Sequence, residues 1–187
     1  FDENCENPYT PSAYSWPSTI SEAHQEKLKG EIQRLLTLLV MKTSIYNIEV
    51  RECTNGKSYI MEVSPRGGGN RLAEMLRYAT GVDLVTNSVR AAVGEPVVDV
   101  EQKPYNGCWA EIILHSEKAG VFDSLWISDE IKDNIVERDL WIESNTEVGG
   151  FSGANEAIGT LVLRFDTQEQ LDEVLTNQSK YVKVVLK

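Results

Sequence analysis

The hydrophobic and polar positions of this chain alternate between helical and strand-like spacing. Helical spacing first appears after Ser21, a residue type that favours the N-cap position, and returns in two shorter segments that end at Gly81 and Gly94. Between them, two strand-like runs flank Asn55-Gly56, the dipeptide that most strongly indicates a two-residue hairpin turn. The first half of the chain is therefore predicted to form a helix, a β-hairpin and two further helices.

Beyond residue 107 the apolar runs become shorter and more strand-like. They predict strands over residues 108–115, 121–127, 136–143, 158–165 and 181–186. A short helical turn is predicted at 129–134, and a longer helix with Asp166 as its N-cap extends to about Lys180. The glycine-rich segment Thr146–Asn155 is interpreted as a mobile loop in preference to a substrate lid. Helices mixed with antiparallel strands place the chain in the α+β class.

The hairpin brings two glutamates together if its loop consists of Asn55-Gly56 alone. Counting outward from that turn pairs Glu49 with Glu62 on one face of the hairpin. The opposite face is apolar and consists of Ile48, Val50, Met61 and Val63. Opposed carboxylates with Cβ atoms roughly 5 Å apart repel each other, and a divalent cation such as Mg²⁺ compensates for that repulsion. The alternative is a solvated polar face with Arg51 as a diagonal neighbour of the glutamates.

A glycine triplet follows the second strand and leads into the next helix. Gly67, Gly68 and Gly69 permit backbone conformations in which successive N–H groups line up on an anion. Arg66 and the N-terminus of the helix add positive potential beside them. A glycine triplet alone is also typical of a flexible loop. Next to a carboxylate pair, it indicates a site for a metal-bound phosphate.

A family resemblance is carried by residues 17–96, which contain IEV, a hairpin, MEVSPRGGGN, a helix and ATGVDL in that order. This pattern resembles the C-terminal part of an ATP-grasp domain. The resemblance implies that Glu49 and Glu62 hold the Mg²⁺ (or Mn²⁺) ions that bridge the ATP phosphates. It also implies that Arg66 faces the transferred phosphoryl group or the acyl substrate. Ser64 replaces an asparagine that often ligates the second metal, as in the formate-using phosphoribosylglycinamide formyltransferases, and is carried over to the metal site.

ATP-grasp enzymes join a carboxylate to an amine or similar nucleophile through an acylphosphate made from ATP. The resemblance therefore implies a carboxylate–amine ligase, of the amino-acid ligase or carbamoyl-phosphate-synthase-like kind, with ATP and Mg²⁺ as cofactors. Its substrates would be a small-molecule carboxylate and an amine. The N–H groups of Gly67 to Gly69 would steady the acylphosphate, and Asn70 and Arg71 are assigned to substrate contact from their position.

The same resemblance divides the chain into parts. Residues 1–98 are predicted to be the C-terminal part of an ATP-grasp domain with an irregular lead-in over 1–20. Residues 99–107 are predicted to be a linker, and residues 108–187 a small α+β C-terminal domain. The chain begins at Phe1, and the family's phosphate-binding lysines and adenine-binding strand have no counterpart in it. We therefore expect a fragment that is inactive without the missing N-terminal part of the same protein.

The net charge and the length of the apolar runs argue against two kinds of partner, nucleic acid and a lipid membrane. A net charge of −11 without a basic patch argues against nucleic acid, and no apolar run approaches the length of a membrane span. Cys5, Cys53 and Cys108 show neither metal-ligand spacing nor a disulfide framework, so reduced cysteines in a cytoplasmic protein are expected. His24 and His115 are assigned structural roles. A homodimer is a further option.

Two other classes of function stay open beside the carboxylate–amine ligase. One is ATP-grasp chemistry on formate or bicarbonate, as in purine synthesis or biotin carboxylation. The other is a non-catalytic binding module that keeps the fold without the reaction. Turnover that depends on formate or bicarbonate would distinguish the first class from the carboxylate–amine ligase. The effect of replacing Glu62 with Gln would distinguish the non-catalytic module, because a purely structural hairpin should tolerate that change.

Overall fold

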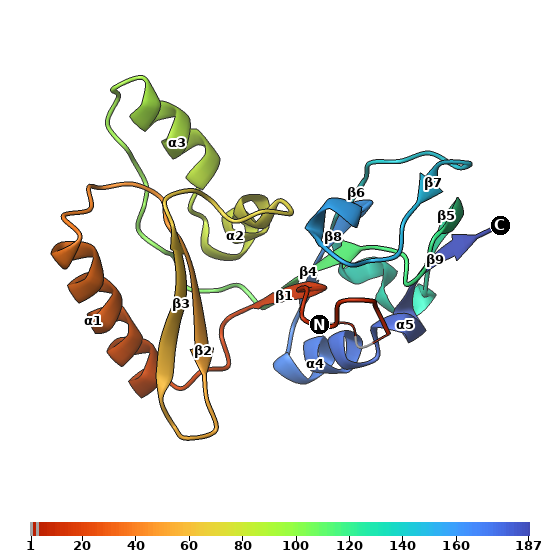
Figure 1. Cartoon of the computed structure of the whole chain (residues 1–187), viewed down its shortest axis with the longest axis horizontal. Helices are drawn as coiled ribbons and strands as arrows, with labels where there is room; N and C mark the ends of the chain where they lie inside the picture. The colour runs from red at the N-terminus through yellow and green to blue at the C-terminus, as the bar shows by residue number, and fades with distance from the viewer. Residues whose placement is uncertain (1, 3) are drawn as a thin grey trace. The chain divides into compact units, whose positions relative to one another are not determined.

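The computed structural model describes every residue of the chain except Phe1 and Glu3. Helices and antiparallel sheets form two compact units (Figure 1). The first, which we call the hairpin unit, comprises Ser18–Arg77 and Gly81–Gln102. The second, the sheet unit, comprises the residues up to Pro17 together with Tyr78–Thr80 and Lys103–Lys187. The predicted α+β class is confirmed.

These units are drawn differently from the predicted ranges 1–98, 99–107 and 108–187, which stay a prediction. The N-terminal residues join the sheet unit because β1 (Ala13–Trp16) pairs antiparallel with β4 (Cys108–Leu114). The predicted irregular lead-in over 1–20 is therefore wrong at β1, and its residues 1 and 3 lie outside the described residues. Residues 99–107 contain no helix or strand, as expected of a linker.

The hairpin unit contains three helices and a two-stranded sheet. Helix α1 (Glu22–Leu38) begins after Ser21, whose side chain accepts a hydrogen bond from the His24 backbone N–H, so the predicted N-cap is confirmed. The hairpin strands are β2 (Asn47–Glu52) and β3 (Ser58–Ser64), and α1 packs along β3 (Figure 1). Helices α2 (Leu72–Thr80) and α3 (Leu84–Ala92) follow. Helix α2 ends at Gly81, where φ is +76°, a value that suits glycine.

The hairpin unit has a small core. Of the apolar face predicted for α1, only Leu28 is fully buried, and Leu39 is exposed. Met75 and Val82 are the other large apolar side chains that this unit buries among the described residues. Many apolar side chains are exposed instead, namely Leu38, Leu39, Val40, Tyr59, Met61, Val85, Val89, Val93, Val97, Val98 and Val100.

The sheet unit is built on two antiparallel sheets. One has the order β1-β4-β8-β6, with β8 at Gly159–Phe165 and β6 at Ile135–Leu140. The other has the order β7-β5-β9. Its strands are β7 (Glu147–Val148), β5 (Gly120–Ile127) and β9 (Val182–Leu186), and the helical segments are η1 (Asp129–Asn134), η2 (Ala154–Glu156), α4 (Gln168–Thr176) and α5 (Gln178–Tyr181).

A single large core stabilises the sheet unit. The central strands β4 and β8 are buried along almost their whole length, because strands neighbour each of them on both sides and α4 packs against both. Burial of this apolar surface is the main stabilising contribution. The core is formed by Ala110, Ile112, Leu114, Phe122, Ile131, Ile158, Leu161, Leu163, Phe165, Leu171, Val174, Tyr181 and Val182.

Three predictions for this unit need correction. The N-cap of α4 is Thr167 instead of Asp166, because Thr167 and Gln170 form the reciprocal capping box one residue later. The helix ends at Thr176, and α5 is a separate segment before β9. The segment Thr146–Asn155 contains β7 and is anchored by Phe151, whose side chain is fully buried, so it is not a free loop. Among the described residues, no helix is long and apolar enough to cross a membrane.

Candidate functional site

The hairpin loop has three residues, so the predicted two-residue turn is wrong. Cys53 N–H donates to the Lys57 carbonyl at 2.9 Å, and Gly56 N–H donates to the Cys53 carbonyl at 2.9 Å. Gly56 has a φ of +72°, as expected for the glycine that closes a three-residue hairpin loop. Further along the ladder, a register shift between Glu49 and Val50 leaves Met61 as an extra residue in β3.

Glu49 and Glu62 lie directly opposite each other on the hairpin, as predicted. Their Cβ atoms are therefore about 5 Å apart, and both side chains are exposed. Arg51 Nε lies 3.5 Å from Glu49 Oε1, which is the neighbour that the alternative interpretation invoked. The Ser64 hydroxyl donates a hydrogen bond to Glu62 Oε1. Each glutamate thus has one polar partner and keeps a second carboxylate oxygen for a ligand.

The register shift changes the opposite face of the hairpin. Ile48, Val50 and Val63 are half-buried as predicted, and Ile60 joins them opposite Val50. Met61 was predicted on that apolar face, but its side chain is 61% exposed, because an extra residue in one strand turns the side chains beyond it to the other side. Tyr59 is exposed as well.

The turn between β3 and α2 uses a different backbone from the one predicted. None of Gly67, Gly68 and Gly69 has a positive φ; Asn70 and Arg71 do, at +51° and +64°. A Cβ at Gly68 would lie 2.6 Å from Leu72 Cδ2, whereas a Cβ at Gly67 or Gly69 would meet nothing within 4 Å. The triplet therefore leaves open space beside its backbone, which a ligand can approach.

Positive groups gather around this open turn. Arg66 Nη1 donates to the Gly67 carbonyl at 2.8 Å, which folds the guanidinium back over the glycines. Arg71 is the N-cap residue of α2 and provides no side-chain cap, although its Nε lies 3.8 Å from Glu74 Oε1. The first N–H groups of a helix carry partial positive charge, and an anion stabilises them. The turn is thus suited to a phosphate or a carboxylate.

The donor set at Glu49 and Glu62 fits a hard divalent cation. Two opposed carboxylates and a nearby hydroxyl offer oxygen atoms only, which is the ligand type that Mg²⁺ and Mn²⁺ prefer. Mg²⁺ usually takes one or two carboxylates and leaves its other positions to water or substrate phosphates. Ser64 contacts Glu62, so it orients that carboxylate whether or not it reaches the ion itself.

The other polar residues singled out from sequence lie apart from this site. His24 Nδ1 pairs with Glu52 Oε1 near the loop end of the hairpin, a structural contact in keeping with its predicted role. All three cysteines are free, as predicted. The structure also brings Asp2, Cys5 and His115 together in the sheet unit. Sequence reasoning missed this cluster, because no local spacing links residues more than 100 positions apart.

Comparisons with known proteins recognise the fold but no close relative. No family model and no curated protein match the chain. The solved structure of phosphoribosylglycinamide synthetase from Anaerococcus prevotii matches with a TM-score of 0.77 at 23% identity, over 95% of this chain and 46% of that one. The L-amino acid ligase from Bacillus licheniformis matches with a TM-score of 0.80 at 13% identity, over 96% and 45%. The fold is that of the C-terminal portion of ATP-grasp ligases.

A third ATP-grasp match was solved with a nucleotide. It is the biotin carboxylase domain of the Hydrogenobacter thermophilus 2-oxoglutarate carboxylase, in complex with MgADP, ADP and bicarbonate. The TM-score is 0.70 at 15% identity, over 97% of this chain and 41% of that one. The chain therefore spans about half the length of the ATP-grasp structures that it matches, and at these identities the likeness shows the fold alone.

Proposed function

We propose that this chain is the metal- and acylphosphate-binding part of an ATP-dependent, Mg²⁺-dependent ligase that activates a carboxylate for attack by an amine. One observation carries the proposal: Glu49 lies directly opposite Glu62, next to an open turn that bears Arg66 and a helix N-terminus without a side-chain cap. An isolated carboxylate pair weakens a hairpin, and a phosphate-bound cation turns the same pair into a site.

The residues of this chain have distinct roles in the proposed reaction. Glu49 and Glu62 would hold the cation, and Ser64 fixes the orientation of Glu62 through its hydrogen bond or would ligate a second ion. When bound, Mg²⁺ neutralises the charge that develops as a phosphoryl group moves to the substrate carboxylate. Arg66 faces that phosphoryl group as a fixed, planar donor.

The glycine turn holds the acyl part of the substrate in this proposal. The open space beside Gly67 and Gly69 lets an anion approach the backbone N–H groups without meeting a side chain. Asn70 and Arg71 have positive φ values, so the turn is a defined bend from which their side chains contact the substrate. Arg66, Arg71 and the N-terminus of α2 stabilise the acylphosphate until the amine attacks.

The rest of the active site would come from the missing N-terminal part of the same protein. This chain spans less than half of each matched ligase, and the hairpin unit exposes a large set of apolar side chains. We take these exposed side chains as the candidate face that another part of the protein covers. We therefore expect this chain alone to be inactive and the intact protein to provide the nucleotide-binding half.

Bicarbonate is a second candidate substrate. The biotin carboxylase domain named above was solved with MgADP and bicarbonate and shares the fold at a TM-score of 0.70. Bicarbonate is itself a small carboxylate anion, so the same turn suits it. Phosphate release that depends on bicarbonate, without any amine, would favour this alternative.

The test is a phosphate-release assay on the intact protein with ATP, Mg²⁺ and a panel of amino acids, formate or bicarbonate. We expect turnover with one acyl substrate, and a loss of roughly 100-fold or more in kcat/KM in Glu49→Gln and Glu62→Gln, because metal charge stabilisation contributes several kcal/mol. Glu52→Gln, on the same strand, is the matched control and should retain activity. Full activity in Glu62→Gln, or no turnover with any substrate, would contradict the proposal and favour a non-catalytic module.

A further inference from the structure

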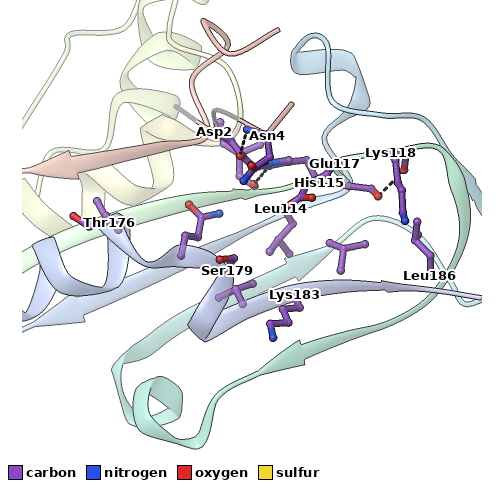
Figure 2. Close-up of a pocket in the computed structure, with 16 residues that line it drawn as sticks. Asp2, Asn4, Leu114, His115, Glu117, Lys118, Thr176, Ser179, Lys183 and Leu186 are labelled. Carbon is purple, nitrogen blue, oxygen red and sulfur yellow. Dashed lines mark hydrogen bonds and ion pairs between the residues drawn. The ribbon is translucent and has the colours of Figure 1, made fainter. Parts of the chain in front are cut away.

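Three side chains that commonly ligate metals meet inside the sheet unit. One carboxylate oxygen of Asp2, Cys5 Sγ and one ring nitrogen of His115 all lie within 4.8 Å of one another. Cys5 and His115 are buried, and the Asp2 side chain is 21% exposed. Asp2 and His115 also line a cavity of about 780 Å³, whose walls come from the ends of β4 and α4, from α5 and from β9 (Figure 2).

The His115 ring is held in one orientation. Its Nδ1 lies 2.7 Å from the Ile113 carbonyl oxygen, so the proton on Nδ1 donates to that carbonyl. Phe151 stacks on the ring with centroids 4.0 Å apart and an angle of 21° between the planes. The second nitrogen, Nε2, therefore faces Asp2 Oδ2 at 3.0 Å (Figure 2). In the neutral ring with its proton on Nδ1, Nε2 is an acceptor and so is the carboxylate oxygen, and a cation bound to both would join them.

The two other groups lie beside that nitrogen. The Asn4 backbone N–H donates to Asp2 Oδ1 at 3.0 Å, so the other carboxylate oxygen, Oδ2, is the one that faces His115. Cys5 Sγ lies within 4.8 Å of both ligand atoms. A bound cation would displace the proton of the Cys5 thiol.

We propose that Asp2, Cys5 and His115 form a binding site for a divalent transition-metal ion of the zinc class. One nitrogen, one sulfur and one oxygen ligand suit Zn²⁺ and not Mg²⁺. A ligating histidine almost always donates its other N–H to a carbonyl or carboxylate, as Nδ1 does here to Ile113. Atoms within 4.8 Å of one another need only small side-chain movements to reach zinc–ligand bonds of about 2.0–2.3 Å.

This site is separate from the proposed ATP site and does not depend on it. Its ligands belong to the sheet unit, whereas Glu49 and Glu62 belong to the hairpin unit and offer oxygen only. Three protein ligands leave a fourth position of a tetrahedral ion open. Asp2 and His115 also line the cavity, where Glu117, Lys118 and Lys183 are the other charged side chains on the wall. A water or an anion in the cavity would complete the coordination.

The experiment is a titration of the 187-residue chain, carrying no histidine tag, with Co²⁺ and then with Zn²⁺. We expect one equivalent of Co²⁺ to give a thiolate-to-cobalt charge-transfer absorption, and Zn²⁺ to displace it. Cys5→Ser should remove the absorption, and Cys5→Ser and His115→Gln should weaken zinc binding at least 10-fold, since even a second-shell partner is worth roughly 10–100-fold. Cys53→Ser removes an exposed thiol elsewhere and is the matched control.

Circular dichroism establishes that each variant is folded. If Cys5→Ser does not fold, X-ray absorption on the zinc-loaded wild-type chain decides instead, and the site requires one sulfur among the nearest neighbours of the ion. The proposal is overturned if the folded wild-type chain takes up no Co²⁺ with a thiolate absorption. It is also overturned if the absorption is lost in Cys53→Ser and kept in Cys5→Ser. In either case the cluster is a hydrogen-bonded group that binds no metal.

Discussion

The sheet unit and the hairpin unit differ in how much core each has of its own. In the sheet unit, thirteen side chains from β4, β5, η1, β8, α4, α5, β9 and one connecting residue form a single buried cluster. In the hairpin unit, Leu28, Met75 and Val82 are the large apolar side chains that are buried, while apolar residues at the end of α1, on β3 and on α3 stay exposed. The candidate site lies in the hairpin unit, which buries few large apolar side chains.

Because of this difference, most of the buried core lies in one unit of the chain and the candidate site in the other. A unit with a large core tolerates little change in its interior and keeps its shape without help. A two-stranded hairpin is marginally stable on its own in water, and packing against a helix, as α1 packs along β3, stabilises it. The hairpin unit thus exposes more large apolar side chains than the sheet unit, and it bears the opposed carboxylates of the candidate site.

The largest expected effect is on the free energy of unfolding, when truncation of a buried side chain in the sheet unit is compared with truncation of an exposed one in the hairpin unit. Leu161→Ala removes a fully buried side chain from β8 and should lower the free energy of unfolding by roughly 2–5 kcal/mol. Met61→Ala removes an exposed side chain at the bulge of β3 and should change it by less than about 0.5 kcal/mol. Urea unfolding followed by circular dichroism measures both. Equal losses would break the contrast between the two units.

A smaller effect is expected from the charge pair on the hairpin. Glu62→Gln in this chain removes the repulsion between directly opposed carboxylates and should leave stability unchanged or raise it by up to about 1 kcal/mol. The same unfolding experiment, carried out without divalent cations, measures it. A clear loss of stability would mean that the Ser64–Glu62 hydrogen bond outweighs the repulsion, and that the pair is structural.

The smallest expected effect is on the local stability of the segment Thr146–Asn155, which the buried Phe151 side chain anchors. Hydrogen bonds from the backbone N–H groups of Ser152 and Gly153 lower the pKa of Glu156, against the opposing effect of burial. A lowered folded-state pKa means that the stabilisation is present above the unfolded pKa and is lost as pH falls through the folded pKa. Glu156→Gln should therefore speed amide exchange in this loop at neutral pH. The difference from wild type should disappear in acid, and a difference that persists there would assign it to another cause.

The sequence predicted the helices of the hairpin unit well, because Ser21, Gly81 and Gly94 mark their ends locally. It predicted the pairing of Glu49 with Glu62 for a partly wrong reason. The loop is one residue longer than Asn55-Gly56, and the bulge at Met61 adds one residue to β3, so the two departures cancel at Glu49. Counting outward from a turn cannot detect a bulge, which depends on how each strand packs.

The remaining differences come from contacts between distant residues. The strand β1 was missed, since prolines surround four residues that become a strand only by pairing with β4. The positive φ values of Asn70 and Arg71 depend on the packing of the turn, and residue type alone would have assigned them to the glycines. The Asp2–Cys5–His115 cluster needs the N-terminal residues to lie against the end of β4, and Phe151 stacks on the His115 ring only in the tertiary structure.

The most direct test of the carboxylate site is a Mn²⁺ titration of the isotope-labelled chain followed by NMR. Mn²⁺ broadens the signals of nearby amides and prefers the same oxygen ligands as Mg²⁺. The account predicts that amides next to Glu49 and Glu62 broaden first, that Glu62→Gln abolishes this broadening, and that Glu52→Gln retains it. Broadening spread evenly over the acidic surface, or unchanged in Glu62→Gln, would show that the opposed glutamates are not a metal site.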